Sequence, residues 1–133
     1  MTALGEPVRV GICHCLDCRR HHGTLFFAAA IFAQAAVTVA GETKSYEGRH
    51  FCPRCGSSVF AQSGDEIDLH LGAMEAAESL VPQYELWTVR RLPWLPEFPD
   101  MVQIPRNRES PDSVEGWREI EDESGLDGRG LSG

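Results

Sequence analysis

The sequence predicts a small, mainly β protein organised around bound metal. Short runs of β-branched and aromatic residues recur along most of the chain, separated by glycine and proline. All five cysteines lie in two tight clusters, a distribution typical of metal-binding knuckles rather than of core positions. With 133 residues the chain has room for one hydrophobic core.

The predicted strands are short and follow one another closely. In chain order they are residues 8–12, 26–32, 37–40, 43–47, 50–52, 58–62, 67–71 and 84–88, the last a strand or a turn. The two segments on either side of Gly41 are expected to form a hairpin. In the strand at 67–71 the apolar residues share one face, so His70 falls on the polar face and is expected to be exposed to solvent.

The remaining segments are expected to be irregular or helical. A helical turn or two is predicted around residues 75–80. Pro93, Pro96 and Pro99 exclude a regular element through residues 91–99, because proline cannot donate a backbone hydrogen bond.

The cysteine spacing predicts zinc. Cys13, Cys15 and Cys18 form a C-x-C-x2-C motif, and Cys52 and Cys55 form a C-x2-C motif. Two cysteines separated by only two residues can bind one tetrahedral ion from a single turn of the backbone. Their thiolates are ligands that zinc prefers. A redox pair would precede a helix, whereas Cys55 precedes a turn and a strand, and a disulfide framework would need an oxidising compartment.

Composition and charge exclude several classes of protein. The chain carries a net charge of −8 and lacks the excess of basic residues that is typical of nucleic-acid-binding proteins. No apolar run approaches the roughly 20 residues of a membrane helix. The N-terminus has neither the basic start nor the apolar segment of a signal peptide, so a cytoplasmic protein is expected.

The chain is predicted to divide into a zinc-binding domain over 1–104 and an acidic tail over 105–133. The tail has eight acidic residues against four arginines and little to bury, so it is expected to be mostly disordered. The alternative for part of it is a short docked helix formed by Val114, Trp117 and Ile120.

Basic residues gather beside both cysteine clusters. Arg19 and Arg20 follow the first cluster, and Arg49 precedes the second. One interpretation is that they balance the charge of the zinc thiolates. The other is an anion pocket in which the guanidinium groups bind the carboxylates of a small ligand.

Four segments together resemble the glutathione-dependent formaldehyde-activating enzyme family. They are residues 10–23 with C-x-C-x2-C and two arginines, residues 51–56 with C-x2-C, Leu71-Gly72, and residues 86–95 with Arg-x-Pro-Trp. The resemblance covers about residues 6–100. It implies a β-tent fold of small antiparallel sheets carrying zinc.

The resemblance also implies roles for the cysteines. Cys13, Cys15 and Cys18 would be the catalytic ligands of one zinc ion, and Cys52 and Cys55 would be half of a structural zinc site. The family's N-terminal C-x-C, which completes that second site, is absent from this sequence.

Three explanations of the missing pair remain open. One is that the native protein begins upstream of this sequence, and another is that the second pair recruits His50, His21 or water. Alternatively, Cys15, Cys18, Cys52 and Cys55 form a single ribbon-like zinc site and leave Cys13 free.

The implied activity is that of a carbon–sulfur lyase, joining or releasing a small aldehyde and a thiol such as glutathione. The alternative is a non-catalytic, zinc-stabilised binding module with the same fold. Cys13 favours the enzyme, because a purely structural knuckle needs only C-x2-C. A free strand edge at 8–12 would invite pairing with a second copy, so a homo-oligomer is also considered.

Overall fold

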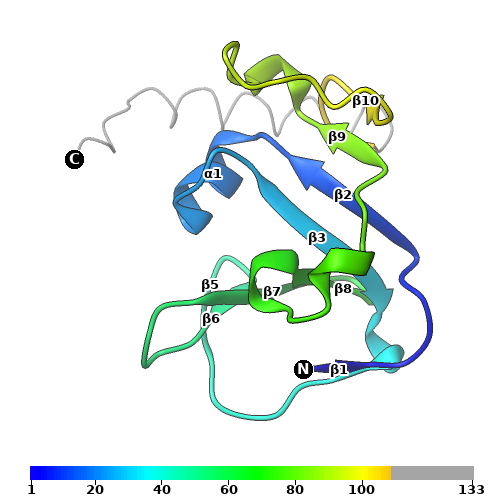
Figure 1. Cartoon of the computed structure of the whole chain (residues 1–133). Coiled ribbons are helices and arrows are strands. Elements are labelled where there is room, and N and C mark those ends of the chain that lie inside the picture. Colours follow the sequence, from blue (N-terminus) through cyan, green and yellow to red (C-terminus); the bar gives the residue numbers. More distant parts are fainter. Residues whose placement is uncertain (109–133) are drawn as a thin grey trace.

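The computed structural model describes residues 1–108, which form a mainly β fold, as predicted (Figure 1). The strands are β1 (Thr2–Ala3), β2 (Arg9–Cys13), β3 (Phe27–Ala33), β4 (Val37–Thr38), β5 (Lys44–Tyr46), β6 (Arg49–Phe51), β7 (Ser58–Ser63), β8 (Glu66–His70), β9 (Tyr84–Leu86) and β10 (Val102–Gln103). The α-helix is α1 (Leu16–His22), and the 3-10 helices are η1 (Gln34–Ala36), η2 (Leu71–Ala73), η3 (Ala77–Ser79) and η4 (Thr88–Arg90).

Eight of the strands form one sheet in the order β10-β9-β2-β3-β8-β7-β6-β5. The pairs from β3 to β5 are antiparallel, whereas β9 runs parallel to both β2 and β10. β1 and β4 form a separate two-stranded ribbon. All eight predicted strands are present, and no helix or strand lies within 91–99. β1 and β10 were not predicted, because a two-residue strand has no readable periodicity.

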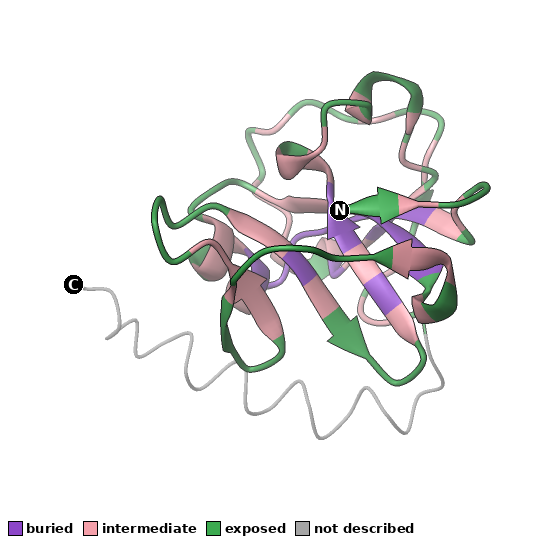
Figure 2. Cartoon of the chain, turned by 90° about the horizontal axis from the view of Figure 1, so that it is seen from below, coloured by how far each residue is buried: buried purple, intermediate pink, exposed green. Residues whose placement is uncertain are grey.

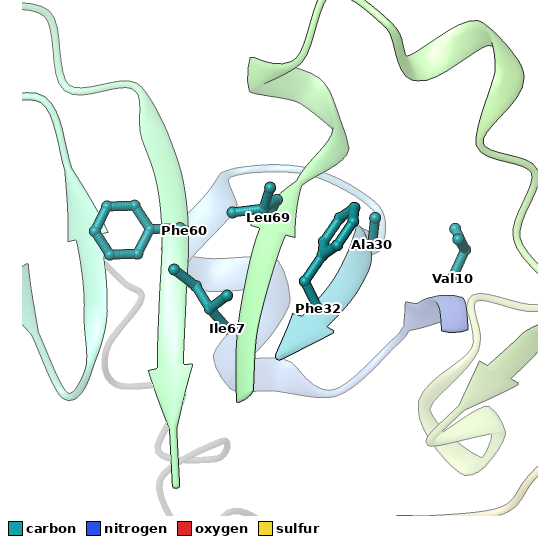
Figure 3. Packing of buried hydrophobic residues seen from close by; sticks show 6 residues of the cluster. All are labelled: Val10, Ala30, Phe32, Phe60, Ile67 and Leu69. Atoms are coloured by element: carbon teal, nitrogen blue, oxygen red, sulfur yellow. The ribbon is translucent and has the colours of Figure 1, made fainter. Parts of the chain in front are cut away.

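The hydrophobic core lies against one face of the central strands (Figures 2 and 3). Its buried residues are Val10, Ala30, Phe32, Phe60, Ile67 and Leu69. Since side chains alternate along a strand, Ile67 and Leu69 point into this core while Asp68 and His70 lie on the opposite face.

The predicted exposure of His70 is wrong, because this side chain is only 3% exposed. The ring of His22 from α1 packs edge-on against it at a centroid distance of 4.6 Å, and Phe27 of β3 does so at 4.8 Å. The alternating pattern identified the polar face correctly but could not show that a helix covers it.

The predicted hairpin around Gly41 is also wrong. β4 pairs with β1, and β5 pairs with β6. The tight turn lies instead at Glu47 and Gly48, which both have positive φ, at 54° and 81°. Two successive residues of positive φ are the signature of a type I′ turn, which matches the twist of a two-residue hairpin.

β2 is an internal strand, so the expected free edge at 8–12 does not exist. It pairs with β3 on one side and β9 on the other. This pairing could not be predicted locally, since β9 comes from more than seventy residues later in the chain. Pairing with a second copy through this strand is thereby excluded, and a homo-oligomer of another kind stays a prediction.

Gly11 of β2 is opposite Tyr84 of β9, and the tyrosine ring occupies the space that a side chain would need. Gly11→Ala is expected to lower the free energy of unfolding by about 1–3 kcal/mol, because an added Cβ overlaps the ring. Urea denaturation measures this change. Gly72→Ala, at a glycine with open space around it, is the matched control and should change stability little. Equal stability of the two variants would contradict the prediction.

The segment after β10 returns to β9. The backbone N–H of Trp87 donates to the carbonyl of Arg106 at 3.1 Å, and its indole Nε1 donates to Asn107 Oδ1 at 2.9 Å. The domain boundary near residue 104 stays a prediction, and the predicted docked helix at 114–120 lies outside the described residues. No helix among residues 1–108 is long and apolar enough to span a membrane.

Candidate metal centre

The first cysteine cluster lies where β2 meets α1. β2 ends at Cys13, and Cys15 is the N-cap residue of α1, its Sγ accepting the backbone N–H of Cys18 at 3.3 Å. Gly23, with φ of 63°, ends the helix and donates its N–H to the carbonyl of Arg19. This one helix therefore turns a linear C-x-C-x2-C motif into a compact cluster.

The three thiol sulfurs fit a single zinc ion. The Sγ atoms of Cys13, Cys15 and Cys18 all lie within 4.8 Å of one another, and the three residues are buried. Sulfurs on one tetrahedral zinc, each about 2.3 Å from the ion, lie about 3.8 Å apart, so small side-chain adjustments suffice. Three protein ligands leave the fourth position of a tetrahedral ion for another molecule.

The thiols of the cluster differ in acidity. Hydrogen bonds with Cys15 and Cys18 raise the pKa of Cys13 well above its ordinary value. Cys18 receives hydrogen bonds from Cys13, Cys15 and Arg49, and these lower its pKa well below that value despite burial. The lowered pKa favours the thiolate form of Cys18, and metal ligation by cysteine requires thiolates.

Trp87 forms the apolar support of the cluster. It is almost fully buried and packs with the three cysteines, together with the half-buried Phe27 and Leu86. The φ of Trp87 is 56°, an uncommon value for a residue with a large side chain. Its backbone conformation is held by the contacts with Arg106 and Asn107 described above.

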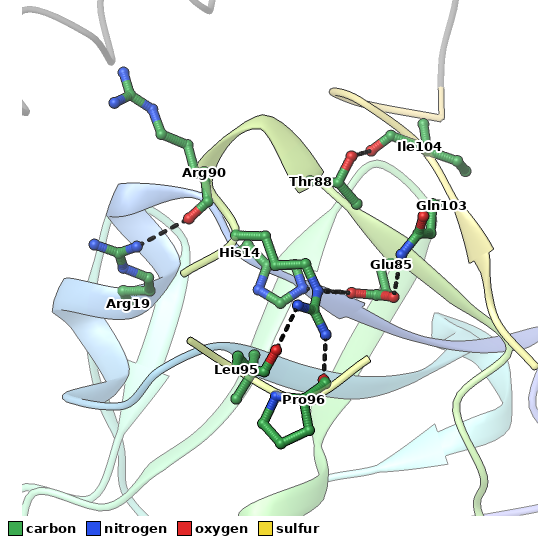
Figure 4. Close-up of polar contacts among 10 residues, drawn as sticks. His14, Arg19, Glu85, Thr88, Arg90, Leu95, Pro96, Gln103 and Ile104 are labelled. Atoms are coloured by element: carbon green, nitrogen blue, oxygen red, sulfur yellow. Dashed lines mark hydrogen bonds and ion pairs between the residues drawn. The ribbon is translucent and has the colours of Figure 1, made fainter. Parts of the chain in front are cut away.

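A buried ion-pair network fixes the segment between Cys13 and Cys15 (Figure 4). His14 Nε2 lies 2.8 Å from Glu85 Oε1, and Arg91 Nε donates to the same oxygen at 2.9 Å. Gln103 Nε2 donates to the other carboxylate oxygen at 3.2 Å. His14 and Glu85 are both 0% exposed. Arg91 also donates to the carbonyls of residues 95 and 96, so the network links the metal cluster to the proline-rich segment.

The ionisation of this network follows from its contacts. Burial by itself would raise the pKa of Glu85, but hydrogen bonds from His14, Arg91 and Gln103 outweigh it and lower this pKa. Burial lowers the pKa of His14 despite its contact with Glu85. Glu85 is thus a carboxylate at neutral pH, and a neutral His14 donates its Nε2–H to it.

An open cavity of about 370 Å³ adjoins the cluster on the face of the sheet opposite the core. Cys18 and His22 of α1 line it, as do Arg49 of β6 and Asp68 and His70 of β8. It combines one candidate metal-ligating thiol, one guanidinium and three carboxyl groups, those of Asp17, Glu47 and Asp68. A small polar molecule in this cavity would therefore lie beside Cys18 of the cluster.

The three arginines predicted to bind a ligand are not equivalent in the structure. Arg49 lines the cavity with Cys18. Arg19 Nη1 donates to the carbonyl of Arg90 at 3.0 Å, linking α1 to η4 (Figure 4), and Arg20 is exposed; neither lines that cavity.

The second cysteine pair forms a turn at the surface. Cys52 is half-buried and Cys55 is exposed. The backbone N–H groups of Arg54 and Cys55, and the Cys55 thiol, lower the pKa of Cys52. Within residues 1–108, the one group of three or more side chains placed to bind a metal ion is Cys13, Cys15 and Cys18. Cys52 and Cys55 do not belong to it.

The two histidines considered as additional ligands of this pair are hydrogen-bonded to other residues. His21 Nε2 is bonded to Ser58 Oγ at 2.9 Å, and His50 Nδ1 is bonded to Thr43 Oγ1 at 3.0 Å. A second zinc ion at Cys52 and Cys55 therefore stays a prediction.

Sequence reasoning missed Glu85 and Asp68. Both lie in predicted strands, where an acidic residue reads as an outward-facing side chain. For Glu85, the available signal was its position between two large apolar residues, Tyr84 and Leu86. Asp68 carried the same signal, since it lies between Ile67 and Leu69, whereas the exposed Asp65 lies between Gly64 and Glu66.

Comparison with known proteins agrees with this site. The sequence profile of the family described as glutathione-dependent formaldehyde-activating enzyme matches residues 1–90, which include all five cysteines. Comparison with curated proteins finds no match. Because the profile covers about two thirds of the chain, from its first residue through β9 and η4, the protein belongs to the glutathione-dependent formaldehyde-activating enzyme family.

Proposed function

We propose that this protein is a zinc-dependent carbon–sulfur lyase that joins or releases a small aldehyde and a thiol such as glutathione. The observation that carries the proposal is the position of Cys18. It belongs to a group of three thiols that fits zinc, and it also lines an open cavity. A structural zinc site is normally closed by four protein ligands, whereas a catalytic one leaves a position for substrate.

When bound, zinc supplies a Lewis acid that lowers the pKa of a thiol and favours its thiolate at neutral pH. The side chains of the protein orient the substrates around that position. Arg49 is placed to pair with a carboxylate of a peptide thiol, because it lines the same cavity as Cys18. We assign Arg19 and Arg20 a weaker, longer-range part in attracting the same anionic thiol.

We further propose that the fold is the β-tent of the family and that Cys52 and Cys55 hold a second, weaker zinc site. The lowered pKa of Cys52 supports the latter, since metal ligation requires a thiolate. A cytoplasmic location would keep both cysteine groups reduced.

The function is tested with zinc-loaded protein, glutathione and isotopically labelled formaldehyde. Nuclear magnetic resonance exchange spectroscopy measures how fast the S-hydroxymethyl adduct and free glutathione interconvert. The protein is expected to raise this rate above that of the uncatalysed reaction. Zinc-dependent binding of glutathione without any acceleration would favour the binding module instead, and neither binding nor acceleration would reject both functions.

Cys13→Ser is expected to preserve the fold and to weaken glutathione binding at least ~10-fold, because it removes one of three thiolates around the open position. Isothermal calorimetry measures the binding, and circular dichroism verifies the fold. Cys55→Ser, at an exposed cysteine outside the cluster, is the matched control. Unchanged glutathione binding by Cys13→Ser would contradict a substrate position on this cluster.

A further inference from the structure

Asp68 faces the cavity beside the metal centre. It lies between Ile67 and Leu69, which point into the core, so its side chain is on the other face of β8. There it lines the same cavity as Cys18 and Arg49. The Asp68 carboxyl group is thus present in the cavity that the proposed substrates would occupy.

Asp68 is unusual among the acidic residues of this sheet because its carboxylate is unpaired. Glu66, two residues earlier, forms two hydrogen bonds with Arg9, and Glu85 accepts three from its neighbours. Asp68 makes no hydrogen bond or ion pair with any residue from 1 to 108. A half-buried carboxylate that serves only the fold is normally hydrogen-bonded, so this group is available to a ligand.

The acidity of Asp68 suits proton transfer near neutral pH. Burial raises its pKa to about 6, even though the charge of Arg9 acts in the opposite direction. A general acid or base is most effective when its pKa lies close to the working pH. At pH 7 most of the Asp68 population is ionised and can accept a proton, and the protonated form can return it.

The histidines that line the cavity with Asp68 are not expected to change their charge near pH 6. The charged and titratable side chains that line the cavity or act on Asp68 are Arg9, Asp17, Cys18, His22, Glu47, Arg49, Glu66, His70 and Tyr84. Histidines would ordinarily titrate in this range. Here burial lowers the pKa of His22 to about 4 and that of His70 to about 3, so both stay neutral.

We propose that Asp68 is the general acid and base of the reaction, accepting the proton of the substrate thiol and returning it to the product alkoxide. This role rests on the proposed function. It assigns to Asp68 the one task that the three cysteines and Arg49 leave unfilled, since ligated thiolates and a guanidinium do not shuttle protons at neutral pH.

Every bond and proton is accounted for in the addition of the thiol to the aldehyde. The S–H bond of the thiol breaks, and its proton goes to a carboxylate oxygen of Asp68. The thiolate sulfur then bonds to the carbonyl carbon, and the electron pair of the C=O bond moves to oxygen. The protonated Asp68 gives its proton to that oxygen, which completes the hydroxymethyl group and regenerates the carboxylate. Release of the aldehyde reverses these steps.

The test compares Asp68→Asn with the wild type in the exchange assay between pH 5 and 8. Asn has the same shape but cannot carry the proton, so the catalysed rate at pH 7 is expected to fall at least ~100-fold. The wild-type rate should decline as the pH falls through about 6, and this inflection should be missing in Asp68→Asn. Asp65→Asn, at an exposed aspartate three residues away, is the matched control.

Two further measurements separate this role from a structural one. Glutathione binding and zinc content of Asp68→Asn should equal those of the wild type, since Asp68 is not a ligand. Carbon-13 resonance of the Asp68 carboxyl group should titrate near pH 6 without any substrate.

Each outcome decides between the two proposals. An active wild type with less than ~10-fold loss in Asp68→Asn, or with the pH inflection retained, would overturn the role of Asp68 alone. A folded, zinc-loaded wild type without activity would overturn the proposed function and the role of Asp68 with it.

Discussion

Replacement of Glu85 by alanine is expected to lower the free energy of unfolding by about 3–5 kcal/mol. The variant leaves the largely buried Arg91 without its carboxylate, removes the acceptor of His14 Nε2 and opens a cavity among His14, Arg91 and Gln103. Removing one partner of a buried ion pair costs far more than the pair itself contributes, because the remaining charge stays desolvated.

Chemical denaturation measures the loss. Glu78→Ala, at an exposed glutamate of η3, is the matched control and should change stability by less than about 0.5 kcal/mol. Because His14 stands between Cys13 and Cys15 of the candidate metal centre, the Glu85 variant is also expected to bind zinc more weakly. Similar stability of Glu85→Ala and Glu78→Ala would contradict a stabilising role of the ion-pair network around His14.

The same network sets a pH dependence of stability. The pKa of Glu85 is lower in the folded chain than its ordinary value of 4.5, so its contribution to stability is complete above that pH. It is lost as the pH falls through the lower, folded-state pKa. Glu85→Ala should therefore remove part of the acid sensitivity of the wild type.

The strands could be predicted because their signal is local. Alternation along residues 67–71 places Ile67 and Leu69 in the core, and the structure agrees. The partners of the strands could not be predicted in the same way. β9 joins β2 in parallel from a distant part of the chain, and that pairing is what buries Glu85 beside His14.

The site was predictable to the extent that it depends on residue spacing. Cys13, Cys15 and Cys18 come together as their spacing predicted. Their helix was not predicted, because the sequence does not show that the Cys15 thiol caps α1. Asp68 and His70 share the cavity face for a reason that depends on packing, since α1 folds over β8 and converts a polar strand face into a half-buried wall.

Removal of zinc is expected to have the second large effect. Wild-type protein should contain at least one zinc ion per chain, and at a free zinc concentration 1,000 times the dissociation constant the ion stabilises the fold by about 4 kcal/mol. Cys15→Ser should abolish binding at the first cluster, because Cys15 is both a proposed ligand and the N-cap of α1. Its unfolding temperature should then no longer respond to added zinc or to chelator.

Elemental analysis and thermal unfolding with and without chelator test this expectation. Cys55→Ser separates the two cysteine groups, since it leaves the first cluster intact and should lose at most a second ion. A wild type with two ions and a Cys55→Ser variant with one would place zinc at both groups. A zinc content unaffected by Cys15→Ser would contradict the first cluster as the metal centre, and with it the argument that Cys18 presents a metal to the cavity containing Asp68.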